Sequence, residues 1–165
     1  GLGGLGHMAV KIAKAMGAEV TVFSTSPDKE KDAKKLGAKN FVMTKDKKNF
    51  GPVMGKLDLI IDTVSAPHDF SIYMSTLKIG GTHVLVGVAP EPNQIAAMAL
   101  IHGRKSLAGS LIGGLKETQE MLDFCARKKV FADIELISAD QINEAYDRTV
   151  KSQVKYRFVI DAKTL

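Results

Sequence analysis

Gly1-Leu2-Gly3-Gly4-Leu5-Gly6 opens the chain, and the residues that follow it, 7–16, have the apolar spacing of a helix. The six residues fit the pattern G-x-G-x-x-G, in which glycine backbone approaches the pyrophosphate of a dinucleotide. Gly1 permits a tight turn, Gly3 leaves room for the phosphates, and Gly6 lets the helix pack closely. The start of the helix would add unpaired N–H groups and a positive dipole end facing the anion. The predicted cofactor contacts are therefore Gly1, Leu2, Gly3, Gly4, Leu5 and Gly6.

The residues behind this glycine loop, residues 1–6, give it the context that a dinucleotide site requires. Ala9, Val10 and Ile12 begin an apolar helical face, Gly17 supplies a helix stop, and residues 19–23 read as a strand. The alternative is a glycine turn present for steric reasons alone. Because the fingerprint should follow a buried central strand, and no residue precedes Gly1, we expect a sheet that lacks its first strand. The two neighbours of that strand would then keep open edges.

The whole chain alternates between strand and helix patterns. This alternation predicts an α/β fold, a Rossmann-like doubly wound parallel sheet with helices on both faces. Residues 1–130 would form the dinucleotide-binding domain, and residues 131–165 a tail that completes this domain or belongs to a neighbour. Residues 44–56 would form a loop or short helix. The predicted strands are 19–24, 40–43, 57–62, 83–87, 106–109, 133–137 and 156–160, and the predicted helices are 7–16, 27–36, 67–77, 94–102, 116–127 and 139–150.

Composition excludes several classes of protein. Of the 165 residues, 45% are hydrophobic and 25% charged, values that suit an ordinary globular domain. No apolar run is as long as a membrane span and no signal peptide is visible, so we expect no membrane partner. The single cysteine, Cys125, allows no internal disulfide and suits a reducing, cytoplasmic compartment. The net charge is +5, but lysines alternate with acidic residues and no nucleic-acid motif accompanies them, so we expect no nucleic-acid partner.

The residues at the end of the predicted strand 19–24 select the cofactor. This strand is the second of a dinucleotide-binding unit when the missing first strand is counted. A carboxylate at this position would bind the ribose of NAD, but the chain has Ser24-Thr25-Ser26 followed by Lys29. Hydroxyl groups and an ammonium can bind a 2′-phosphate instead, so this segment favours NADP. Two observations limit the inference. Ser26 could simply cap the next helix, and Asp28 brings a negative charge nearby.

Long segments resemble one enzyme family. GLGGLGHMAVKIAKAMGAEVTVFSTS, IDTVSAPHD, THVLVGV, AGSLIGGLKETQEMLDFC and VKYRFVID resemble zinc-dependent medium-chain alcohol dehydrogenases, especially the cinnamyl alcohol dehydrogenase-like branch. The resemblance covers essentially the whole chain. It implies that the glycine loop holds the pyrophosphate and that Ser24, Thr25, Ser26 and Lys29 hold the 2′-phosphate. The further contacts that it implies, with the adenosine side, the nicotinamide and the inner substrate pocket, are Thr63, Gly87, Ser110, Leu111 and Ile112.

The resemblance also implies an activity that this chain does not carry alone. The family's zinc ligands and proton relay lie mostly before the glycine loop, and here the one cysteine and four dispersed histidines have no zinc-ligand spacing. We therefore expect no catalytic and no metal residues in the chain, with zinc only in an intact enzyme that interconverts a primary alcohol and its aldehyde. The tail would pack on the missing catalytic domain, and strands 83–87 and 106–109 fit a homodimer edge. A zinc-free quinone or enoyl reductase of the same superfamily and a non-catalytic NADP-binding module are the alternatives.

Overall fold

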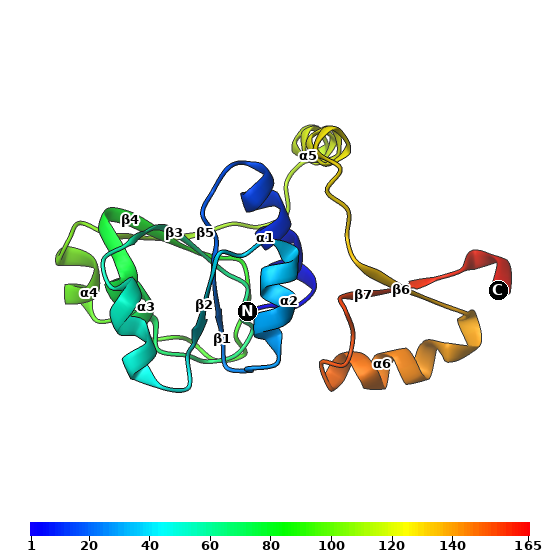
Figure 1. The fold of residues 1–165 in the computed structure, drawn as a ribbon, viewed down its shortest axis with the longest axis horizontal. Coiled ribbons are helices and arrows are strands. Elements are labelled where there is room, and N and C mark those ends of the chain that lie inside the picture. The colour runs from blue at the N-terminus through cyan, green and yellow to red at the C-terminus, as the bar shows by residue number, and fades with distance from the viewer.

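The computed structural model describes all residues from Gly1 to Leu165, which form alternating helices and strands (Figure 1). The pattern agrees with the α/β fold expected from the sequence. No helix combines the length and the apolar character needed to cross a bilayer. The helices are α1 (Gly4–Ala15), α2 (Lys29–Leu36), α3 (Phe70–Thr76), α4 (Ala97–Ile101), α5 (Leu115–Lys128) and α6 (Ile142–Val150), and the strands are β1 (Thr21–Ser24), β2 (Asn40–Met43), β3 (Leu57–Asp62), β4 (Leu77–Leu85), β5 (Ser106–Gly109), β6 (Ile134–Ile137) and β7 (Arg157–Ile160).

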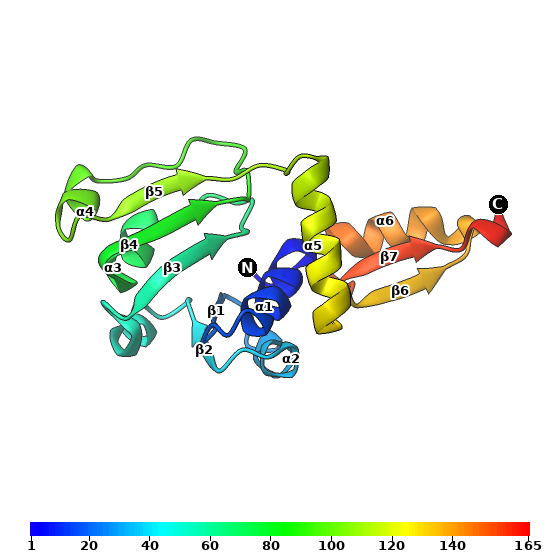
Figure 2. The same cartoon turned by 90° about the horizontal axis from the view of Figure 1, so that it is seen from above.

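All strand pairs are parallel, and the strands form three sheets. The sheets have the orders β1-β2, β3-β4-β5 and β6-β7. β1 and β3 therefore each pair on one side only, and the expected continuous sheet is divided between them. Figure 2 shows β3, β4 and β5 side by side, with α1 between this sheet and the β6-β7 pair.

Several element boundaries differ from the sequence prediction. Helix α1 begins at Gly4 and not at residue 7, because the helical turn starts inside the glycine loop, with Gly3 as its N-cap. Helices α3 and α4 are shorter than predicted. Strand β4 begins at Leu77, where the sequence predicted a helix running on to a stop at Gly80-Gly81. These glycines lie within a register shift between β3 and β4, and Gly80 has a φ of +76°. The two glycines thus form an irregularity inside a strand and do not end a helix.

The apolar core is made of two clusters, one on each side of the division between the sheets. The first joins Leu2 of the glycine loop and Val10 of α1 to Val22 of β1 and to α2. The second joins Ile60 of β3 to Met74 and Leu77 at the junction of α3 and β4. Leu2 has an exposed fraction of 3%, so its side chain anchors the start of the glycine loop in the core.

The tail, residues 131–165, contains β6, α6 and β7 and contacts the rest of the chain through α1 and α2. Tyr156 stacks on His7 with ring centroids 4.6 Å apart. Lys11 of α1 pairs with Asp133, and Lys155 pairs with Asp32 of α2 at 2.8 Å. The apolar side chains of the tail strands remain partly uncovered, with exposed fractions of 51% for Ile134 and 65% for Leu136.

Candidate functional site

The glycine loop leaves open space where the sequence predicts phosphate groups. A Cβ placed on Gly3 would meet no atom within 4 Å, whereas a Cβ on Gly6 would lie 2.0 Å from the Gly1 carbonyl oxygen. Gly6 is therefore required for the close approach of α1 to the loop, and Gly3 keeps the mouth of the loop clear. The first turn of α1 contains no acidic side chain, and its first N–H groups have no helical partner. An anion is the natural ligand of this backbone.

The hydroxyl groups of residues 24–26 stand at the end of β1, a strand whose Val22 shares a core cluster with Leu2 of the glycine loop, and Lys29 begins α2. Ser24 is buried, and its Oγ accepts a hydrogen bond of 3.1 Å from the Ser26 N–H. Thr25 is exposed, and Ser26 and Lys29 are half-buried. Helix α2 has Asp28 as its N-cap, without a side-chain hydrogen bond, so Ser26 is not the cap that the sequence allowed.

Thr63 and Gly87 meet at the carboxyl ends of β3 and β4, beside the glycine loop. The Thr63 hydroxyl donates a 3.0 Å hydrogen bond to the Gly1 carbonyl oxygen. A Cβ on Gly87 would lie 2.4 Å from the Val64 carbonyl oxygen, so only glycine fits there. The structure thus brings Gly1, Thr63 and Gly87 into one region, where parallel α/β sheets bind ligands.

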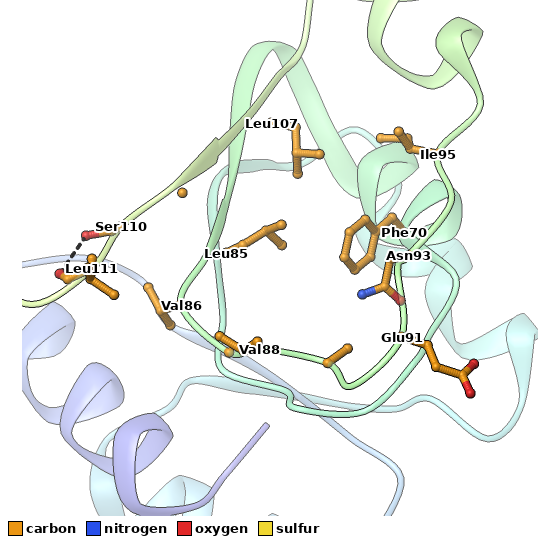
Figure 3. Close-up of a pocket in the computed structure, with 13 residues that line it drawn as sticks. Phe70, Leu85, Val86, Val88, Glu91, Asn93, Ile95, Leu107, Ser110 and Leu111 are labelled. Atoms are coloured by element: carbon orange, nitrogen blue, oxygen red, sulfur yellow. Dashed lines mark hydrogen bonds between the residues drawn. The ribbon is translucent and has the colours of Figure 1, made fainter.

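Ser110, Leu111 and Ile112 follow β5. Ser110 and Leu111 lie at the side of a cavity (Figure 3), whereas Ile112 is not among its lining residues. This cavity of about 620 Å³ is lined by Gly87, Ser110 and Leu111 together with apolar side chains of α3, β4 and β5. Leu111 and Ile112 have exposed fractions of 89% and 90%, so their side chains contact little of this chain. Ser110 is held at the strand end, because its N–H donates to the Leu85 carbonyl oxygen at 3.0 Å.

The sequence prediction missed a cluster of Asp62, His68 and His83 below the Thr63–Val64 turn. One carboxylate oxygen of Asp62 accepts hydrogen bonds from His68 at 2.7 Å and from His83 at 3.2 Å. Burial alone would raise the pKa of Asp62, but hydrogen bonds from His83, the Val64 N–H and His68 together lower it to about 2. The carboxylate thus contributes stability above its ordinary pKa, and this contribution is lost as the pH falls toward 2. The histidines lie 15 residues apart in the sequence, so no spacing rule could reveal the cluster.

The remaining titratable side chains form no metal centre. No group of three or more His, Cys, Asp or Glu side chains is placed to hold a metal ion, so the residues of this chain do not fit a zinc site. His7, which directly follows the glycine loop in the sequence, is buried against the tail. Its Nδ1 lies 3.2 Å from the Gly3 carbonyl oxygen, and its Nε2 accepts from the Asp133 N–H at 3.3 Å. Cys125 is buried on α5.

Comparison with known proteins gives one consistent result. The sequence profile described as zinc-binding dehydrogenase matches residues 4–127. NADP-dependent alcohol dehydrogenase C 1 of Mycolicibacterium smegmatis is 51% identical over 165 residues, which cover 100% of this chain and 47% of the relative. Among solved structures, a cinnamyl alcohol dehydrogenase of Sorghum bicolor has a TM-score of 0.95 at 46% identity, covering 98% of this chain and 46% of that one.

A second solved structure adds a bound cofactor. The CAD of Helicobacter pylori, solved in complex with NADP(H), has a TM-score of 0.87 at 41% identity and covers 99% of this chain and 46% of its own. The chain spans about half the length of the curated relatives that it matches. The parallel α/β arrangement described above therefore matches the nucleotide-binding half of cinnamyl alcohol dehydrogenase structures.

Proposed function

The chain belongs to the zinc-binding dehydrogenase family, and on this premise we propose that it is the cofactor-binding portion of an NADP-dependent alcohol dehydrogenase. The observation that carries the proposal is the open backbone cradle at Gly3 beside the carboxylate-free hydroxyl segment 24–26 and Lys29. The NADP(H)-bound Helicobacter relative and the NADP-dependent Mycolicibacterium relative support the same choice of cofactor.

In this proposal each part of the site has a separate task. The glycine loop and the first turn of α1 bind the pyrophosphate through backbone N–H groups. Ser24, Thr25, Ser26 and Lys29 bind the 2′-phosphate, for which hydroxyl donors and an ammonium provide charge-assisted hydrogen bonds. Thr63 lies on the adenosine side. Gly87 and the segment 110–112 border the nicotinamide and exclude water from one of its faces. When bound, NADP supplies the hydride acceptor or donor for the reaction.

We infer that the β2-β1 pair and the β3-β4-β5 sheet are two halves of one doubly wound sheet. β1 and β3 each have a free edge, and the order 2-1 followed by 3-4-5 is that of a dinucleotide-binding fold with one strand between the halves. In this arrangement residues 1–130 are the NADP-binding domain. Residues 131–165 are a tail that packs on a catalytic domain, which would cover the exposed Ile134 and Leu136.

The substrate in this proposal is a primary alcohol or its aldehyde, the class in which the relatives are named. The residues described here do not hold zinc, so no step of the reaction is assigned to a metal on this chain. Their contribution is to bind the cofactor, to orient it and to exclude water. A homodimer joined along the free edge of β5 would enclose the cavity beside Gly87.

The test is the relative affinity of the protein for NADPH and NADH, measured by enhancement of cofactor fluorescence. We expect tighter binding of NADPH, and we expect Lys29→Met to weaken NADPH binding roughly tenfold, the effect of one charge-assisted hydrogen bond, with little change for NADH. Lys31→Met is the matched control, because Lys31 is an exposed lysine of the same helix. Equal affinity of the wild type for the two cofactors would contradict the proposal.

A further inference from the structure

Two histidines share one buried carboxylate directly below the predicted cofactor site. Asp62, at the end of β3, accepts hydrogen bonds from His68 Nε2 at 2.7 Å and from His83 Nε2 at 3.2 Å on the same oxygen. Its other oxygen accepts from the Val64 N–H at 2.9 Å. The exposed fractions of the Asp62, His68 and His83 side chains are 7%, 17% and 1%, so water competes little for these hydrogen bonds.

The hydrogen bonds distinguish the two rings. Both nitrogens of His68 face acceptors, because Nδ1 lies 2.8 Å from the Ala66 carbonyl oxygen and Nε2 lies 2.7 Å from Asp62. His68 is therefore held from both sides of its ring. His83 differs, since its Nε2 faces Asp62 while its buried Nδ1 has no partner. His68 thus provides the shorter and more firmly fixed of the two histidine contacts to Asp62.

Asp62 connects this cluster to the predicted cofactor site. Its main-chain carbonyl oxygen accepts from the Val86 and Gly87 N–H groups at 2.9 Å and 3.0 Å. The turn that its side chain holds, Thr63–Val64, contacts the glycine loop on one side and Gly87 on the other, through the Thr63 hydroxyl and the Val64 carbonyl. A movement of Asp62 would therefore displace both predicted contacts together.

We propose that His68 is a positioning residue of the cofactor site, whose ring clamps Asp62 and so fixes the Thr63–Val64 turn between the glycine loop and Gly87. The inference rests on the proposed dinucleotide site. Loss of the His68 ring would release Asp62 and with it both contacts of the turn, so cofactor affinity would fall.

The Tyr73 ring of α3 also contacts the cluster, edge-on to His68 with centroids 5.5 Å apart. The experiment separates the two histidines, because a variant at His68 leaves His83 in place and the matched variant at His83 leaves His68 in place.

The experiment has two arms. In the first, ¹⁵N spectra of the histidine rings of the wild type should show both nitrogens of His68 in hydrogen bonds and one nitrogen of His83 without a partner. In the second, NADPH affinity is measured for the wild type, His68→Gln and His83→Gln. His68→Gln should bind NADPH roughly tenfold more weakly than the wild type. His83→Gln should lose less, because His83 contacts Asp62 at the longer distance of 3.2 Å.

The possible results separate the two proposals. A His68 nitrogen without a hydrogen bond, or wild-type NADPH affinity in His68→Gln, overturns the positioning role even when NADPH binds well. If the wild type binds no NADPH, the proposed function fails and the positioning role fails with it, while the ring spectra still decide whether His68 is held at both nitrogens. The spectra need no variant, so they remain decisive where a substitution prevents folding.

Discussion

At the scale of single residues, the glycines of the loop have different physical reasons to be glycine. Gly6 faces the Gly1 carbonyl oxygen, and a Cβ there would lie 2.0 Å from it. Gly3 faces open space, and its φ of −132° is accessible to any residue. Sterics within the chain therefore explain Gly6 but not Gly3. A ligand that approaches Gly3 explains it, and this difference can be measured.

We predict that Gly3→Ala and Gly6→Ala separate folding from cofactor binding. Gly6→Ala should lower the free energy of unfolding by about 2 kcal/mol, because the new methyl group forces the loop away from α1. Gly3→Ala should change the unfolding free energy by less than about 0.5 kcal/mol, since nothing in the chain opposes the methyl group. Both variants should bind NADPH more weakly. Urea denaturation and fluorescence titration of NADPH provide the two measurements, and unchanged NADPH affinity in Gly3→Ala would contradict a phosphate at this position.

At the scale of secondary-structure elements, the sequence predicted those elements whose side chains alone specify them. The amphipathic spacing of α5 and the short apolar strand β5 were predicted within one residue of their ends. The start of β4 was not, because Gly80-Gly81 reads locally as a helix stop. Its role in a strand depends on pairing with β3, more than 15 residues earlier. The division into three sheets could not be predicted either, because local patterns carry no information about which edges pair.

The same argument applies to the candidate site. Glycine, serine and lysine at fixed offsets from predicted strands could be identified from spacing, since strand ends converge at one edge of a parallel sheet. The side chains of Asp62, His68 and His83 meet because β4 pairs with β3 in one particular register and because the 63–69 segment folds back. The position of His7 shows the same dependence, since its ring contacts the Gly3 carbonyl oxygen and also stacks on Tyr156, 149 residues later.

The tail offers a prediction at the level of elements. Tyr156 stacks on His7 and packs against the first core cluster, and it is one of the main apolar contacts between the tail and α1. We predict that Tyr156→Ala removes about 1–2 kcal/mol of local stability, because both the stacking and the buried ring area are lost. Amide hydrogen exchange in β6 and β7 should then become roughly tenfold faster, while β3 and β4 keep their protection.

A matched substitution controls for the loss of a tyrosine in general. Tyr146 lies on α6 in the same tail and has an exposed fraction of 71%, so Tyr146→Ala should leave exchange in β6 and β7 unchanged. Equal acceleration in both variants would mean that the stacking contact with His7 does not hold the tail.

At the scale of the whole molecule, uncovered polar edges and apolar side chains lie on the same side of the β3-β4-β5 sheet. β5 pairs only with β4, so its other edge carries unpaired N–H and C=O groups. Leu111 and Ile112, immediately after this strand, are almost fully exposed. A free strand edge flanked by exposed apolar side chains is a template for pairing with another chain. Symmetry makes a second copy of the same strand a suitable partner, since the interface of a two-fold dimer is self-complementary.

We predict that the protein forms a dimer through this edge and that Ala108→Lys disrupts it. Ala108 is an exposed residue of β5, and a two-fold axis at the edge would bring the two introduced lysines close together, where like charges repel. Sedimentation velocity should show a dimer for the wild type and a monomer for Ala108→Lys. Ala162→Lys adds the same charge at an exposed alanine near the C-terminus and should remain dimeric. A dimer that survives Ala108→Lys would place the contact elsewhere, and the free edges of β1 and β3 would then be the surfaces to test.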